Sequence, residues 1–344
     1  MRRIAAAGDK ERGAIAVIVA LLMVVLLGFA AIAIDVAKLY SERAQLQNSA
    51  DAVALAVARN CAVPSPTNAC ADITGNVRRL ANENAVDGQS TVVDPVGLDI
   101  SKRRVSATTM AKENRSAPNT VSLFFARALG FDSAQVSATS TVTWGSPSAG
   151  TTPFPLAFSV CQVSTTLEKG AQLLEAHNPN DNNDKGSPDC IYANNPVPGG
   201  FNWTREAAGV CGSSIDLSVS RSYSETGNDA PDNCATTLKS WAQSINDKKD
   251  VVVLLPVFDS ASGTGSSATY HLAAFAAFKV QGWKFSGGTG LPFVFQNTSS
   301  SAGSNCTGSC RGIIGSFIRY VSLGDGYTLG PVSSFGATVV ELTS

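Results

Sequence analysis

The chain has 344 residues, of which 44% are hydrophobic and only 15% are charged, and its formal net charge is −1. The apolar fraction is that of a folded protein and excludes disorder over most of the length. Because no excess of positive charge is present to attract phosphate groups, the composition also excludes nucleic acid as a partner. The length suits about two domains besides a membrane segment.

Residues 14–34 form an uncharged apolar segment, AIAVIVALLMVVLLGFAAIAI. As a helix this segment would be about 32 Å long, which matches the hydrocarbon core of a bilayer. Basic residues precede it, and positive residues stay on the cytoplasmic side of a membrane. They are Arg2, Arg3, Lys10 and Arg12. We therefore predict a cytoplasmic basic tail (residues 1–13), one transmembrane helix (residues 14–34) in the plasma membrane, and an extracytoplasmic C-terminal body.

Two kinds of processing would change the N-terminus of the mature protein. Ala31-Ile32-Ala33 has the small-x-small form of a signal-peptidase site, although the apolar run is longer than that of a usual signal peptide. Cleavage after Gly13, as in prepilins, would keep the helix, but Ile18 stands where this processing usually requires Glu. Each alternative leaves the body outside the cytoplasm.

The helical pattern continues beyond the apolar segment as far as residue 59. Residues 35–59 contain no Gly or Pro, and their apolar side chains recur at helical spacings that form one stripe. The stripe comprises Val36, Leu39, Leu46, Ala50, Val53 and Val57. We predict one helix over residues 14–59, whose stripe covers either the core of its own domain or a partner helix.

A nearly continuous series of short motifs runs through residues 11–58. It consists of Arg12-Gly13, Asp35, Leu39-Tyr40, Leu46-Gln47-Asn48 and the pattern Ala-Asp-Ala-x-Ala-Leu-Ala at residues 50–56. The series resembles the N-terminal segment of the TadE/TadG-like family of Tad (Flp) pilus-assembly proteins. The resemblance singles out Asp35 at the membrane exit and Tyr40, Asn48 and Asp51 on the helix.

This resemblance implies a function. It points to a non-enzymatic, membrane-anchored structural or accessory component of a Tad (Flp-type) pilus assembly system. The implied partners are the lipid bilayer and, through the N-terminal helix, other pilus-assembly proteins or a second copy of the chain. The alternative is a membrane-tethered extracellular binding or adhesion module, which the Asn-, Gly- and Ser-rich residues 178–233 would serve.

The residues that follow the helix predict a small α+β unit, so that residues 35–144 together resemble pilin-like architecture. Asn119 and Gly130 are suitable as the cap and the end of an amphipathic helix, with Val121, Phe124, Phe125, Ala128 and Leu129 facing inward. The other expected elements are helical turns at residues 77–84 and strands at residues 92–100, 105–112 and 134–144.

A Gly-, Pro-, Ser- and Thr-rich stretch at residues 145–155 predicts a linker to a second, β-rich domain at residues 156–344. Its expected elements are strands at residues 251–258, 270–285, 311–323 and 337–342 and a helix at residues 237–246. This half also resembles the C-terminal region of actinobacterial TadG-related proteins through LLPVFD, YHLAAFAAFKVQGW and CRGIIGSFIRY. The predicted fold class is therefore α+β.

Eight cysteines follow the apolar segment, and their even number favours disulfides in an oxidising compartment. They are Cys61, Cys70, Cys161, Cys190, Cys211, Cys234, Cys306 and Cys310. Short loops make two local pairs plausible, Cys61 with Cys70 and Cys306 with Cys310, while the sequence leaves the connectivity open. A zinc site is the weaker alternative, because no C-x-x-C pair occurs and only His177 and His271 could supply imidazole.

Three further patterns were tested for metal binding or catalysis, and none predicts a cofactor, a metal or an enzyme. Asp259 follows an apolar run, but the D-x-S-x-S hydroxyls of a von Willebrand A metal site are displaced, which favours a strand-ending turn. Residues 180–186 lack the ligands of an EF-hand calcium loop. His271 could meet Ser260, Ser262 or Ser266, yet no G-x-S-x-G elbow is present.

Overall fold

The computed structural model shows an α+β protein, as the sequence predicts. The structure describes residues 9–64, 70, 74–93, 96–113, 117, 119–166, 170–175, 191–197, 201–207, 209–219, 221–223, 232–263, 268–298, 305–308, 310–322 and 326–343. The chain divides into two compact units. The first comprises residues 1–58, 68–142 and 342–344, and the second comprises residues 59–67 and 143–341.

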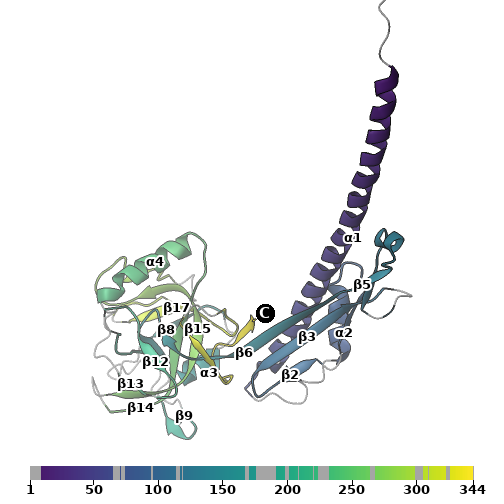
Figure 1. Ribbon diagram of the computed structural model, residues 1–344. Coiled ribbons are helices and arrows are strands. Elements are labelled where there is room, and N and C mark those ends of the chain that lie inside the picture. The colour runs from purple at the N-terminus through teal and green to yellow at the C-terminus, as the bar shows by residue number, and fades with distance from the viewer. Residues whose placement is uncertain are drawn as a thin grey trace, which may run out of the picture. The chain divides into compact units, whose positions relative to one another are not determined.

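Helix α1 (Asp9–Cys61) runs without interruption for 53 residues (Figure 1). Within the described chain it is the helix that is long and apolar enough to cross a membrane, and its most apolar stretch has no buried residue. The prediction of one helix that continues from the apolar segment into the body is confirmed. The helix ends three residues before Pro64, which is consistent with the lack of a backbone N–H in proline.

Strands of a seven-stranded sheet, a two-stranded sheet and a short helix follow α1 in the first unit. The elements are α2 (Thr74–Glu83), β1 (Ser90–Val92), β2 (Gly97–Asp99), β3 (Arg104–Ala111), β4 (Thr120–Ser122), the 3₁₀ turn η2 (Ala126–Leu129), β5 (Ser133–Gln135) and β6 (Ser137–Thr151), which continues into the second unit. Strand β3 lies between β1 and β6 and also pairs with β2, while β4 and β5 form an antiparallel hairpin.

One face of the C-terminal half of α1 is buried by its own chain. Leu46 is fully buried and packs with Ala111, Val121 and Val136. The Thr109 hydroxyl of β3 donates a 2.7 Å hydrogen bond to the Leu46 carbonyl, and the Ser49 hydroxyl donates a 2.8 Å bond to Ala81 of α2. The apolar stripe was expected to cover either the core of its own domain or a partner helix. At Leu46 the structure supports the first alternative.

The amphipathic helix expected at residues 119–130 is wrong. These residues form β4, an irregular segment and the single turn η2, and the side chains of Phe124, Phe125 and Leu129 are exposed instead of inward. Gly130 does end the turn, in the left-handed conformation that glycine adopts readily. A contact from far along the chain, described below, binds the backbone N–H groups of Phe124, Phe125 and Ala126 within this segment.

The second unit is built on an eight-stranded sheet of order β11-β7-β14-β15-β17-β8, with β13 and β16 paired to β15. Its elements are β7 (Leu156–Ser159), α3 (Val160–Thr166), β8 (Gln172–Glu175), β9 (Ile191–Tyr192), β10 (Asn195–Pro196), β11 (Phe201–Trp203), β12 (Ser214–Asp216), β13 (Arg221–Tyr223), η3 (Asp232–Cys234), α4 (Ala235–Asn246), β14 (Val251–Ser262), β15 (Thr269–Lys284), β16 (Val294–Phe295), β17 (Gly312–Ile318), β18 (Thr328–Gly330) and β19 (Val339–Leu342). The long hairpin β14–β15 is its centre, and the rings of Phe158, Phe278 and Phe317 meet with centroid separations of 5.0–5.3 Å.

The residues expected to form a linker are largely strand. Residues 145–151 belong to β6, where they pair with β12 and β18. Small hydroxyl residues and glycine fit a strand that pairs with other strands on both sides. Because those strands lie far along the sequence, the local composition alone predicts a loop. Short strands, β9 to β13, also occur within the Asn-, Gly- and Ser-rich residues 178–233.

Candidate functional site at the end of the apolar segment

Asp35 is the first residue after the apolar segment, and its side chain is bound by the backbone of a distant loop. It is only 4% exposed, whereas Ile34 and Val36 beside it are exposed. Its carboxylate accepts hydrogen bonds from the backbone N–H groups of Phe124 (2.7 Å), Phe125 (2.9 Å) and Ala126 (2.6 Å). Three consecutive donors on one carboxylate make a specific and directional contact.

These three N–H groups lie at the start of η2, where a helical turn leaves its donors without intrahelical partners. Phe125 occupies the N-cap position of η2 and supplies no side-chain cap. The Asp35 carboxylate takes the place of that cap, from another helix. Burial alone would raise the pKa of Asp35, but the three backbone donors and the nearby Lys38 outweigh it and hold the pKa below its ordinary value of 3.8.

Lys38, almost one turn further along α1, makes a second link to the same segment. Its ammonium group donates 2.9 Å hydrogen bonds to Glu113 Oε1 and to the carbonyl oxygen of Ser122. Glu113 Oε2 in turn accepts a 3.0 Å bond from the backbone N–H of Ser122. Burial raises the pKa of Glu113, but the bonds from Lys38 and Ser122 have the larger combined effect and lower it from its ordinary value of 4.5.

Asp35, Lys38 and Glu113, here called the exit cluster, together fasten α1 to the β4–β5 hairpin at the point where the apolar segment ends. The two carboxylates act as ionised acceptors, and Lys38 is the donor between helix and hairpin. Such an arrangement resists rotation and sliding of the helix against the hairpin. The cluster therefore holds the helix and the hairpin together.

The other motif residues of the helix have different surroundings. Tyr40 is 73% exposed, and Asn48 is exposed as well. Asp51 is half-buried and accepts a 2.9 Å hydrogen bond from Gln47 within the helix. The structure therefore gives Asp35 a role in holding the fold, whereas it leaves Tyr40 and Asn48 available at the surface.

The comparisons with known proteins concern this same helix. Residues 13–60 match the Tad family model, Flp pilus-assembly TadE/G-like. The chain carries a TadE/G-like domain. Its match ends one residue before the end of α1 and includes Asp35 and Lys38 but not Glu113 or the hairpin. Neither the curated proteins nor the solved structures gave a match.

Sequence reasoning missed the partners of Asp35 and Lys38. Glu113 and residues 122–126 lie some 75 to 91 residues downstream, and no local pattern connects them with the helix. The one available signal was a charged pair three residues apart, Asp35 and Lys38, directly after an uncharged span.

The cysteines of the described chain are all in disulfides. Cys306 pairs with Cys310, as the short loop predicts, and Cys211 pairs with Cys234. Cys61, Cys70 and Cys161 are disulfide-bonded too, while Cys190 lies outside the described residues. Disulfides of this kind are typical of an extracytoplasmic body.

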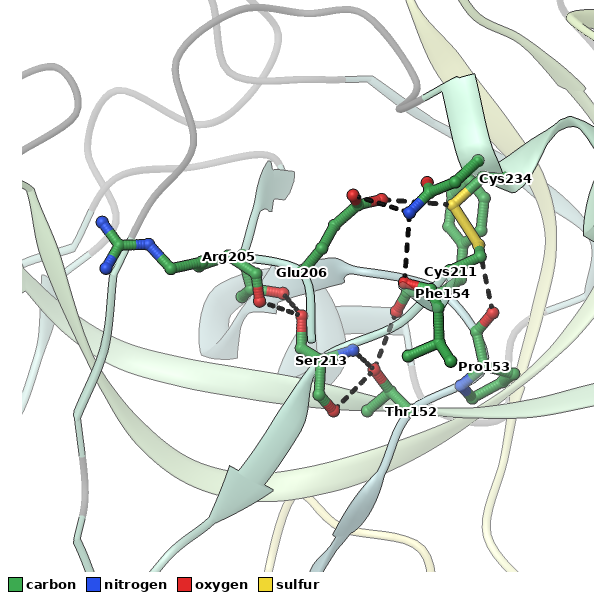
Figure 2. The surroundings of a disulfide bond; sticks show 11 residues. Thr152, Pro153, Phe154, Arg205, Glu206, Cys211, Ser213 and Cys234 are labelled. Atoms are coloured by element: carbon green, nitrogen blue, oxygen red, sulfur yellow. Dashed lines mark hydrogen bonds between the residues drawn. A yellow bond between two sulfur atoms is a disulfide. The ribbon is translucent and has the colours of Figure 1, made fainter. Parts of the chain in front are cut away.

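The Cys211–Cys234 disulfide fixes the start of α4 to the segment before β12 (Figure 2). Glu206 lies beside it and accepts a 2.9 Å hydrogen bond from the Asn233 side chain. On the other side, the Thr152 N–H donates a 2.9 Å hydrogen bond to the Ser213 carbonyl, and the Ser213 N–H donates a 3.0 Å hydrogen bond to the Thr152 hydroxyl. These contacts stabilise the second unit.

The residues considered for metal binding or hydrolysis are arranged differently from what those functions require. Asp259 lies at a bulge within β14, so the expected strand-ending turn is wrong. His271 Nδ1 lies 2.7 Å from Asp259 Oδ1, and the Ser260 hydroxyl donates to the same carboxylate at 3.2 Å. A serine nucleophile would instead have to donate to the imidazole.

Two further predictions on chemistry lie partly beyond what the structure can test. Within the ranges given above, no three His, Cys, Asp or Glu side chains gather as a metal site. Ser266, His177 and the rejected calcium loop at residues 180–186 fall outside those ranges. Ser262 bonds Thr269 across the β14–β15 hairpin at 2.8 Å, as a surface strand pair does.

Proposed function

We propose that the protein is a membrane-anchored, non-enzymatic structural or accessory component of a Tad (Flp-type) pilus assembly system. One observation carries the proposal. The TadE/G-like match at residues 13–60 coincides with helix α1, whose apolar half is exposed in the structure and is long enough to span a bilayer.

The proposed orientation places the N-terminus in the cytoplasm and the residues after the apolar segment outside. Four basic residues lie in the thirteen positions before the apolar segment, against two, Lys38 and Arg43, in the thirteen positions after it, which favours this direction of insertion. The disulfides, whose cysteines all follow the apolar segment, support an oxidising compartment for the body.

The proposed mechanism is mechanical. The apolar half of α1 anchors the chain, and the exit cluster transmits any pull on the anchor directly to the β4–β5 hairpin. The exposed motif residues Tyr40 and Asn48 remain available for other pilus-assembly proteins or for a second copy of the chain. This division of roles explains how one helix can both hold its own unit and meet a partner.

The function is tested in cells of the source organism by deletion and complementation, with surface pili counted by electron microscopy. We expect deletion to reduce surface pili and the wild-type chain to restore them. A matched chain, in which residues 14–34 are replaced by a cleavable signal peptide, should be secreted and should fail to restore them. Normal piliation in the deletion strain would contradict the proposal. Normal piliation with a loss of surface adhesion would favour the tethered adhesion module instead.

The orientation is tested separately with introduced cysteines. Val86, which is 91% exposed, is replaced by Cys for the body, and Ala6 is replaced by Cys for the tail. In intact cells a membrane-impermeant maleimide should label Val86→Cys and spare Ala6→Cys. Labelling of the tail without the body would contradict the orientation.

A further inference from the structure

The loop between β4 and β5 exposes an unusual number of large apolar side chains. Residues 123–132, here called the hairpin tip, include Phe124, Leu129 and Phe131, which are 80%, 68% and 64% exposed, and Phe125, which is 42% exposed. The rings of Phe124 and Phe125 lie 5.9 Å apart. A cluster of this kind is unfavourable in water and indicates a binding surface.

The exit cluster fixes the position of this tip along α1. The N–H groups of Phe124, Phe125 and Ala126 bind Asp35, which directly follows the apolar segment, and one residue of helix is about 1.5 Å long. Helical side chains lean toward the helix N-terminus, so the Asp35 carboxylate reaches toward the membrane side. Figure 1 shows the tip, the short turn that precedes β5, beside α1 and directed toward its N-terminal half.

The backbone of the tip is suited to an apolar environment. The Leu123 N–H bonds the Asp132 carbonyl at 3.0 Å, which closes the loop, and the Phe131 N–H bonds the Ala126 carbonyl at 3.1 Å. Asp35 accepts from the next three N–H groups after Leu123. Because unpaired N–H groups are costly in lipid, this pairing lowers the cost of placing the loop at a membrane.

We propose that the hairpin tip inserts Phe124, Leu129 and Phe131 into the outer interface of the same bilayer that α1 spans. The occupant is the phospholipid surface, because the patch continues the apolar surface of the span at its exit. Phe and Leu side chains of interfacial segments are buried at the boundary between headgroups and acyl chains. Arg127, which lies 3.3 Å from Asp132 and is 66% exposed at its side chain, would lie at the level of the lipid headgroups. The inference rests on the membrane anchoring within the proposed function, and it gives the first unit a second membrane contact.

The test uses the full chain in liposomes that contain lipids brominated near the upper end of the acyl chains, which quench tryptophan on contact. Phe124→Trp and Phe131→Trp report on the tip. Leu22→Trp in the apolar segment reports on the anchor. Val86→Trp is the matched exposed control, because the Val86 N–H binds Gln45, which is ten residues and about 15 Å beyond Asp35 along the helix. The native tryptophans are at most 8% exposed and give a constant background.

We expect quenching at Phe124→Trp and Phe131→Trp to be about threefold greater than at Val86→Trp and to approach that at Leu22→Trp. Quenching of Leu22→Trp alone would overturn the insertion of the tip while leaving the anchor intact, and would assign the apolar patch to a protein contact. Absence of quenching at Leu22→Trp as well would overturn the anchoring on which both proposals rest.

Discussion

The carboxylate of Asp35 accepts a 2.7 Å hydrogen bond from the backbone N–H of Phe124, although 89 residues separate the two in the sequence. The bond joins the first residue after an apolar span to the tip of a β-hairpin. Since Phe125 and Ala126 bind the same carboxylate, the helix can neither turn nor slide without breaking several bonds at once. The apolar segment and the β4–β5 hairpin are therefore coupled at a defined point.

Replacing Asp35 by Asn should loosen the hairpin tip. The amide keeps the size of the side chain but removes the charge and turns a donor toward the loop N–H groups, and charge-assisted bonds are about twice as strong as neutral ones. We expect amide hydrogen exchange at Phe124, Phe125 and Ala126 to accelerate by about tenfold or more. Mass spectrometry of the detergent-solubilised protein measures this exchange.

The matched control is Asp51→Asn, because Asp51 is bonded only within its own helix by Gln47 among the bonds seen in the described chain. It should leave exchange at residues 124–126 unchanged. Equal protection of those amides in Asp35→Asn and in the wild type would show that the carboxylate does not hold the tip.

Acid should weaken the same joint. The pKa values of Asp35 and Glu113 are both lowered in the folded protein, from ordinary values of 3.8 and 4.5, so the unfolded chain binds more protons in this range. Their contribution to stability is thus present above about pH 4.5 and is lost as the pH falls through the lower folded values. We expect Tm to fall between pH 5 and pH 3, about these pKa values, and to fall less in Asp35→Asn combined with Glu113→Gln.

Ionisation of Glu42 should lower the stability of the folded protein, in contrast to that of Asp35 and Glu113. Burial, together with the carboxylates of Asp87 and Glu113, raises the pKa of Glu42, so that its ionisation disfavours the folded state near neutral pH. Glu42→Gln is expected to raise Tm by about one to three degrees at pH 7 and to have no stabilising effect at pH 3. Thermal unfolding followed by circular dichroism provides the measurement, and a lower Tm at pH 7 would contradict the sign.

Sequence alone was sufficient for the elements whose determinants are local. The uncharged segment, the absence of Gly and Pro in residues 35–59 and the alternating or continuous apolar runs predict α1, β3, β14 and β15 correctly. Prediction failed where distant residues decide. Within residues 119–130, the N–H groups of residues 124–126 are bound by Asp35. The strand at residues 145–151 pairs with β12 and β18, and neither set of partners is close in the sequence.

The same distinction applies to the candidate site. The sequence singles out Asp35, because it follows the apolar run directly. It does not identify Glu113 or the backbone of residues 124–126, because a backbone donor leaves no mark in a sequence. Likewise, loop length predicts the Cys306–Cys310 pair, whereas Cys211 and Cys234 could be paired only from the structure.

The contact between β3 and α1 should contribute measurably to stability. Thr109 is fully buried and its hydroxyl donates to the Leu46 carbonyl at 2.7 Å. Thr109→Val keeps the shape and removes the donor, which should lower the free energy of unfolding by about 1 kcal/mol. Thr108→Val is the adjacent control, since the Thr108 hydroxyl bonds Thr139 at the surface and should cost less. Equal losses in the two variants would argue against the buried bond.

The Cys211–Cys234 and Cys306–Cys310 disulfides should contribute differently to the free energy of unfolding. Cys211 and Cys234 are 23 residues apart, and Cys306 and Cys310 are four apart. Because a longer loop loses more chain entropy on closure, replacing the first pair by Ser should cost about 3.5 kcal/mol and the second about 2 kcal/mol. Denaturant unfolding of each double variant measures the difference. A larger loss from the short loop would show that contacts around the sulfurs, and not loop closure, dominate.

The exposed motif residues of α1 should matter for assembly and not for folding. Tyr40 is 73% exposed and Asn48 is exposed as well, so Tyr40→Ala and Asn48→Ala should each change the free energy of unfolding by less than about 0.5 kcal/mol. Leu46 lies between them in the sequence and is fully buried, so Leu46→Ala should cost about 2–5 kcal/mol.

In complemented cells the two surface variants should reduce piliation at wild-type protein levels, whereas Leu46→Ala should reduce piliation in proportion to the loss of folded protein. Electron microscopy and immunoblots of the same cells separate the two effects. Normal piliation with both surface variants would mean that this part of the helix surface meets no partner. The function of α1 would then be confined to the anchor and the joint at Asp35, because the buried stripe is already occupied by the chain itself.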